Sequence, residues 1–321
     1  LGGTMNAPLF VGYNLAAYRL LHYGMKGLRK SRVVPLPGYS PSAKRAVEAR
    51  RLLGLPEDRC VDFCLMADND KRGSAAVRSH VCRYAAEGDY LSFGDGIYVA
   101  KPELAYLQSA ELLTCAELIL LGLDMCGSFV SEDGEFERLS PLASVTSMLA
   151  YIDARSGVRG TFKARQALRY VVDGSASPRE SQLVALLCAP QKWGGYGFKL
   201  PCLNKRLELS PQHRRVLGKN FLSCDLLWQE QSVAIEYDSN QFHSGFHKIN
   251  ADSQRRNVLR SMGINVIDVT ASQLSRAEAF HEIAIQVDRG LGGGLLAKRD
   301  GGWVSRNQEL RHLVLAERVW G

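Results

Sequence analysis

The chain has 321 residues, 46% of them hydrophobic, so it is long enough for two domains that each bury a core. Its net charge of +7 favours a polyanionic partner such as nucleic acid. Eight scattered cysteines exclude a secreted disulfide framework and favour free thiols in the cytoplasm, and the most apolar stretch, 112–125, contains two acids and is too short to cross a membrane.

The first 150 residues contain few motifs. The segments 60–66 and 94–99 have the composition of strands, and 102–123 has the apolar period of a helix. A zinc site using Cys60 and Cys64 is disfavoured, because four residues along a strand span about 13 Å. We expect a smaller α+β domain over residues 5–150 that recognises the substrate or a protein partner.

A basic helical connector is predicted over residues 151–176. Its cations include Arg165 and Arg169, which are candidates to contact the phosphates of a nucleic acid. Simple solvation of a charged helix face is the alternative. The connector is followed by Ser177-Pro-Arg-Glu180, which has the form of a capping box with proline at the first helical position and so predicts a helix start.

Two β-prone runs, 221–228 and 233–237, flank a short polar break, which predicts a hairpin. With a symmetric turn, residues whose numbers sum to 461 face each other, so Asp225 lies opposite Glu236, with Cβ atoms roughly 4.5–5.5 Å apart. Asp238 projects from the same face as Glu236. A turn one residue longer would send Asp225 to the other face.

Carboxylates placed together on a sheet repel one another, so their charge needs relief from a cation, a shared proton or a basic neighbour. A divalent ion such as Mg²⁺ is the most economical relief, because it prefers oxygen ligands. The alternative is the solvated face of an amphipathic sheet, which needs no ion.

After the hairpin, the pattern predicts a helix over 253–262 with Asp252 as its N-cap, then a strand at 264–269. A capping box at 270–273 opens an amphipathic helix that reaches about Arg289. This order of elements predicts a mixed sheet with helices packed on it. A glycine-rich break and a short helix at 307–320 occupy the final segment, 291–321.

The order of elements and the spacing of the acids resemble the PD-(D/E)xK nuclease superfamily, and most closely the domains similar to very-short-patch repair endonucleases. The resemblance covers 177–290. The residues that carry it are Ser177–Ser181, Asp225–Trp228, Glu236–Asp238, Gln241, His243, Asp252, Arg255–Asn257 and Gly263–Thr270. It implies a restriction-endonuclease-like core, a mixed central sheet flanked by helices, that hydrolyses phosphodiester bonds with Mg²⁺ (or Mn²⁺), with DNA as the expected substrate.

The resemblance implies that Asp225 and Glu236 are metal ligands and that Glu180 is the helical acid that completes the site. Glu180 has a second possible role as the third residue of its capping box, which requires no metal. The position of Glu180 in the sequence is compatible with both roles.

The chain departs from the family pattern at Asp238, where the family usually has lysine. Gln241, His243 or Lys248 would then position the attacking water, or Asp238 itself would bind the ion. Arg255 and Arg256 are candidates to pair with phosphate oxygens. A solvated helix face is the alternative for both arginines.

Part of the first domain, 79–127, resembles the antitoxin-like module of AbiEi-type proteins. Together with Asp238, this resemblance gives an alternative function, a non-catalytic DNA-binding or antitoxin-like regulator built on a degenerate nuclease fold. A basic protein-binding module without affinity for nucleic acid is a third possibility.

Overall fold

The computed structural model describes residues 8–23, 25–30, 42–55, 57, 60–65, 77–86, 88–132, 135–138, 140–238 and 246–316. They form two compact units, unit 1 ending at Arg169 and unit 2 running from Tyr170 to Ala316. The predicted connector 151–176 is therefore divided between the units, and the final helix belongs to unit 2. Both units are mixed α/β structures, as expected, but the first unit is the longer of the two and not the smaller domain that the sequence predicted.

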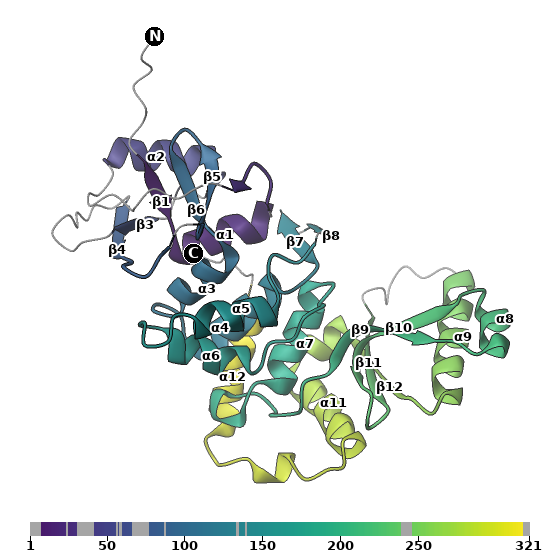
Figure 1. The fold of residues 1–321 in the computed structure, drawn as a ribbon. Helices are drawn as coiled ribbons and strands as arrows, with labels where there is room; N and C mark the ends of the chain where they lie inside the picture. The colour runs from purple at the N-terminus through teal and green to yellow at the C-terminus, as the bar shows by residue number, and fades with distance from the viewer. Residues whose placement is uncertain are drawn as a thin grey trace. The chain divides into compact units, whose positions relative to one another are not determined.

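Unit 1 is built on a six-stranded sheet with the strand order β2-β5-β6-β1-β3-β4 (Figure 1). The strands are β1 (Leu9–Val11), β2 (Arg29–Lys30), β3 (Val61–Leu65), β4 (Val77–Val81), β5 (Tyr90–Gly94) and β6 (Ile97–Ala100), and β7 (Phe129–Glu132) pairs separately with β8 (Glu135–Arg138). The helices are α1 (Tyr13–Tyr23), α2 (Ala43–Leu52), α3 (Pro102–Ser109), α4 (Cys115–Met125), α5 (Val145–Asp153) and α6 (Thr161–Leu168).

Two predicted elements of unit 1 are split in the structure. The predicted strand 94–99 is a hairpin, because Asp95 and Gly96 have φ values of 49° and 72° and form the tight turn between β5 and β6. The predicted helix 102–123 is two helices. Thr114 and Glu117 form a capping box that starts α4 afresh.

Unit 2 contains a four-stranded mixed sheet with the order β12-β11-β10-β9 (Figure 1). Its strands are β9 (Cys202–Glu208), β10 (Phe221–Trp228), β11 (Val233–Asp238) and β12 (Asn265–Thr270). The hairpin β10–β11 and its register are confirmed, since Leu226 pairs with Ile235 and the numbers of each pair sum to 461. β11 and β12 are parallel and are connected through α9 (Phe246–Ser261).

Helices cover both faces of this sheet. On one face, Val258 and Leu259 of α9 pack with Leu222, Cys224 and Ala234 of the sheet in a single buried cluster. On the other face, α11 (Ala277–Gly290) closely approaches Val233. A Cβ at Gly290 would lie 2.6 Å from the Val233 side chain, so glycine permits this approach.

The remaining helical elements of unit 2 are α7 (Pro178–Cys188), η2 (Gln191–Trp193), α8 (Pro211–Leu217), α10 (Ala271–Ser275), η3 (Leu296–Lys298) and α12 (Trp303–Leu315). α8 was not predicted. α9 begins at Phe246, so Asp252 lies inside the helix and is not its N-cap. The predicted helix 270–289 is interrupted at Arg276, whose backbone is extended between α10 and α11. α12 begins at Trp303, ahead of its predicted start.

All eight cysteines lie within the described residues and none forms a disulfide; Cys202 is exposed, and Cys60 and Cys115 are partly buried. None of the helices in the described part of the chain combines the length and apolar character that a bilayer crossing requires.

Candidate active site

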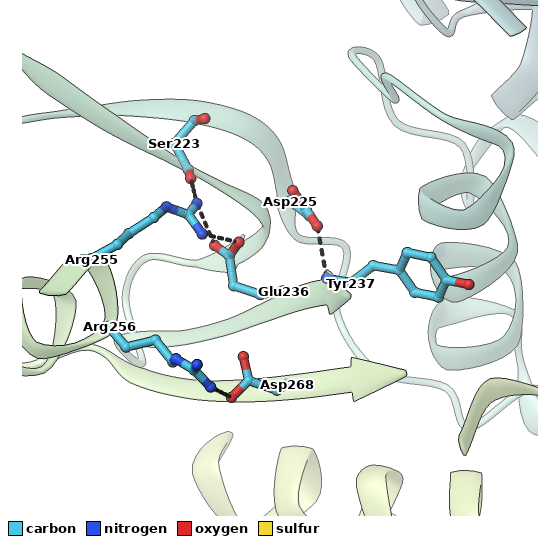
Figure 2. Close-up of polar contacts among 7 residues, drawn as sticks. All are labelled: Ser223, Asp225, Glu236, Tyr237, Arg255, Arg256 and Asp268. Carbon is cyan, nitrogen blue, oxygen red and sulfur yellow. Dashed lines mark hydrogen bonds and ion pairs between the residues drawn. The ribbon is translucent and has the colours of Figure 1, made fainter. Parts of the chain in front are cut away.

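The carboxylate of Glu236, on β11, is held by Arg255 of α9 in a two-pronged ion pair (Figure 2). The distances are 2.5 Å from Nη1 to Oε2 and 3.0 Å from Nη2 to Oε1. Nη2 also donates to the backbone carbonyl of Ser223 on β10. A guanidinium thus supplies the basic neighbour that the acids require, at the position where the sequence predicts a metal ligand.

Asp225 accepts a hydrogen bond of 2.8 Å from the backbone N–H of Tyr237 through Oδ2 (Figure 2). No hydrogen bond to its other oxygen, Oδ1, is found within the described residues. This carboxylate oxygen accepts the N–H in place of a backbone carbonyl of the neighbouring strand. The hydrogen-bonded pairing of β10 with β11 accordingly ends at Leu226 and Ile235, next to Asp225.

The alternation of side chains along β10 is broken around Asp225. Leu222 and Cys224 pack in the same buried cluster as Leu227, although odd and even positions of a regular strand face opposite sides. The prediction that Asp225 and Glu236 lie side by side assumed a regular strand. Figure 2 instead shows the Glu236 carboxylate turned toward Arg255 and that of Asp225 turned toward the Tyr237 N–H.

Glu180 lies in the first turn of α7, and its carboxylate is closely surrounded by donors. Oε2 accepts from the Ala176 N–H at 2.8 Å and from Asn204 Nδ2 at 2.5 Å, and Oε1 accepts from the Ser177 hydroxyl at 3.0 Å. One half of the capping box is present, because the Ser177 side chain accepts from the Glu180 N–H. In the other half, the Glu180 carboxylate accepts from the N–H of Ala176 instead of that of Ser177. Glu180 therefore fulfils its structural role and is also linked to β9 through Asn204.

The pKa values of all three acids are raised, and burial is the largest cause in each case. Burial raises the pKa of Glu236 to about 7, even though Arg255 lowers it, and the charge of Asp225 raises it further. Burial also raises the pKa of Asp225 above its usual value. The pKa of Glu180 is raised by burial and, to a lesser extent, by Asp225. Asp225 is thus electrostatically coupled to both other acids. The three acids and Arg255 are together called the acid site.

The acid site suits a hard divalent cation by its chemistry, because carboxylate oxygens are the ligands that Mg²⁺ prefers. Against this, both oxygens of Glu236 are bonded to Arg255. Within the described residues, no group of three or more His, Cys, Asp or Glu side chains is arranged to hold a metal ion. An ion would therefore need Arg255 to release at least one oxygen of Glu236.

The other predicted site residues are distributed as follows. Asp238 is exposed at the end of β11 and is paired with Thr270 of β12. Arg256 does not lie free for phosphate, because its Nη1 is 3.1 Å from Asp268 Oδ2 (Figure 2). Lys248 belongs to α9, but its side chain is not described. Gln241 and His243 lie outside the described residues.

Arg165 and Arg169 belong to unit 1, whereas the acid site is in unit 2. Arg165, on α6, pairs with Asp153 of α5. Arg169 is exposed directly after α6. Neither residue is part of the acid site.

Asn204 is a site residue that the sequence analysis missed. Its Nδ2 donates to the Gly174 carbonyl at 3.0 Å as well as to Glu180, and its φ is 49°. Asparagine tolerates this left-handed conformation better than most residues, which explains its place within a strand. An asparagine in a strand was the available signal, but nothing local indicated its partner.

Comparison of the chain with protein-family models, with curated proteins and with solved structures finds no match in any of the three. The resemblance to the PD-(D/E)xK superfamily therefore rests on the residues of the chain itself.

Proposed function

We propose that unit 2 is a metal-dependent nuclease domain that hydrolyses phosphodiester bonds of DNA at the acid site. The observation that carries the proposal is the coupling of three acids, Glu180, Asp225 and Glu236, with one ion-paired arginine among them, and burial raises the pKa of Glu236 to about 7 despite that pair. Ionisable groups with strongly shifted pKa values cluster at functional sites. A further cation would offset the remaining negative charge.

In this proposal Asp225 and Glu236 hold a Mg²⁺ or Mn²⁺ ion, and Glu180 completes the site from α7. When bound, such an ion polarises a phosphate and lowers the pKa of a water molecule. Arg255, once displaced from Glu236, is placed to pair with a phosphate oxygen through the same two N–H groups. Asn204 keeps Glu180 oriented toward β9.

The test is cleavage of supercoiled plasmid DNA by the full chain with Mg²⁺ or Mn²⁺ and with EDTA. Asp225→Asn and Glu236→Gln should each lower the cleavage rate by at least about 10²-fold, as expected for loss of a group that stabilises transition-state charge. Asp268→Asn is the matched control, because Asp268 is paired with Glu236 in the same sheet. Undiminished cleavage by Asp225→Asn would remove this residue from the mechanism.

A second candidate is a non-catalytic DNA-binding regulator. The ion pair of Arg255 with both carboxylate oxygens of Glu236 favours this candidate, because it neutralises Glu236 without a metal ion. The presence of Asp238 in place of the family's lysine points the same way. This candidate predicts DNA binding that weakens with salt and is unchanged by EDTA, without cleavage in any divalent metal.

A further inference from the structure

Beyond the acid site, β9 and β10 continue as an antiparallel ribbon whose far ends are joined through α8 (Figure 1). This segment, residues 202–221, is called the arm. It carries five basic residues and one acid, Glu208. The basic residues, all exposed, are Lys205, Arg206, Arg214, Arg215 and Lys219.

Two of these cations are used within the protein. Arg214 donates to the Leu209 carbonyl at 2.8 Å and lies 3.5 Å from Glu208, and Lys205 bonds Gln229. For Arg206, Arg215 and Lys219, no ion pair is present in the described part of the chain. Their positive charges face solvent and are not balanced by neighbouring acids.

An exposed aromatic ring lies among these cations. Phe221, at the start of β10, has 38% of its surface exposed, and the guanidinium carbon of Arg206 is 4.3 Å from its ring centroid. Aromatic rings interleaved with arginine are typical of surfaces that bind nucleic acid, because bases stack on the ring while cations meet phosphates. A solvated basic face has no need of an exposed phenylalanine.

The arm is held in place by α9. Leu209 of the arm, and Leu222 directly after the arm, belong to the buried cluster that contains Leu259. The hydroxyl of Ser261 lies 3.0 Å from His213 Nε2 on α8. The basic surface is therefore formed before any partner binds, which lowers the entropy cost of binding.

The arm lies within reach of a strand bound at the acid site. Phe221 and Asp225 are four residues apart on β10, which is about 13 Å along a strand. Duplex DNA rises about 3.4 Å per base pair, so this separation corresponds to roughly four base pairs.

We infer that the arm binds the phosphate backbone of DNA on one side of the acid site, through Arg206, Arg215 and Lys219, with Phe221 packing against the nucleic acid. The inference that the arm lies beside an active site rests on the proposed nuclease function. Binding by the arm, however, can be measured without cleavage.

The experiment is fluorescence anisotropy of a labelled DNA duplex with the full chain in EDTA, between about 50 and 200 mM salt. The arm variant is R206Q/R215Q/K219Q. Its matched control is R276Q/R289Q/K298Q, which removes the same charge from exposed positions elsewhere in unit 2. Circular dichroism verifies that both variants are folded.

The arm variant should bind at least tenfold more weakly than wild type, and its slope of log affinity against log salt should fall by about 2–3, or roughly 0.9 for each lost phosphate contact. The control should bind like wild type. With a labelled single-stranded oligonucleotide, whose unpaired bases can stack on the ring, Phe221→Ala should weaken binding about fivefold or more with little change of slope. Equal binding by the arm and control variants, or no binding by wild type at low salt, would overturn the inference.

Asp225→Asn separates the two proposals. If Asp225→Asn still cleaves DNA while the arm variant loses binding, the acid site fails as the catalytic centre and the arm inference stands. If Asp225→Asn is inactive while the arm variant binds normally, the acid site stands as the catalytic centre and the arm inference fails.

Discussion

Each unit contains a buried group of polar and ionisable side chains, and the two groups differ in how their charges are matched. In unit 1, the Asp62 carboxylate is 2.6 Å from His80 Nε2 and 3.7 Å from Arg78. In unit 2, Arg255 pairs with Glu236 and its charge also acts on Asp225, while Glu180 interacts with the charge of Asp225; the pKa values of all three acids are raised. One group has basic partners for its acid, and the other has more acids than cations.

The amide of Gln108, fully buried in unit 1, illustrates the matched group. Its Oε1 accepts from the Tyr13 N–H at 2.9 Å, and its Nε2 lies 3.2 and 3.3 Å from the sulfurs of Cys64 and Cys82. The Tyr13 ring stacks on His80, and their centroids are 3.9 Å apart. Both polar atoms of the amide have partners, so this network stabilises and specifies the core.

The acid site of unit 2 has the opposite balance. Buried acids with raised pKa values cost stability, and proteins retain such costs mainly where function requires them. The comparison teaches that a buried polar cluster is a candidate active site when its charges are left unmatched.

The largest expected effect is that of Arg255→Met, which leaves Glu236 and Asp225 without their cation. Unit 2 should lose about 2–3 kcal/mol, somewhat less than fully buried pairs lose, because Arg255 is partly exposed. Urea unfolding can be followed by tryptophan fluorescence, since Trp193, Trp228 and Trp303 all belong to unit 2.

The double variant Arg255→Met/Glu236→Gln should recover much of this loss, because the buried charge is removed together with its partner. A loss in the double variant as large as in Arg255→Met would show that Arg255 acts through packing and not through charge.

In unit 1, Asp62→Asn should cost about 1.5–2 kcal/mol, the usual worth of a hydrogen bond to a charged group. Thermal unfolding monitored by circular dichroism measures it. Asp95→Asn is the control, because Asn-Gly suits the same tight turn and Asp95 is exposed. Stabilisation by Asp62→Asn would mean that this cluster, too, has surplus negative charge.

The smallest effect, when taken per pH unit, is a pH dependence of stability in the metal-free protein. Because the pKa of Glu236 is raised from 4.5 to about 7 on folding, the folded state holds a proton that the unfolded state has released between these values. The stability of wild type relative to Glu236→Gln should therefore fall as pH rises from 4.5 to 7, by at most about 1.4 kcal/mol per pH unit. A difference that is flat with pH would contradict the raised pKa.

The hairpin of unit 2 was predictable because its signals are local. The β-prone runs, the four-residue break and the resulting register of Leu226 with Ile235 follow from neighbouring residues. The helix starts at Ser177 and Thr270 were also found, since capping residues act within one turn.

What the sequence did not reveal depends on contacts between distant segments. The pair of Arg255 with Glu236 requires the rotational phase of α9, whose start at Phe246 was predicted seven residues too late. The broken alternation at Asp225 depends on a side chain that replaces a backbone partner. α8 has a serine cap and a first-turn proline, but it was missed because it has little apolar surface to form a periodic pattern.

The most direct test of the account is calorimetric titration of Mn²⁺ into wild type, Asp225→Asn and Asp62→Asn, each of which keeps the full chain. The two variants remove one buried or half-buried carboxylate charge apiece, from unit 2 and unit 1 respectively. The account predicts that wild type and Asp62→Asn bind Mn²⁺ equally and that Asp225→Asn binds at least about tenfold more weakly. Absence of Mn²⁺ binding by wild type, or unchanged binding by Asp225→Asn, would contradict it.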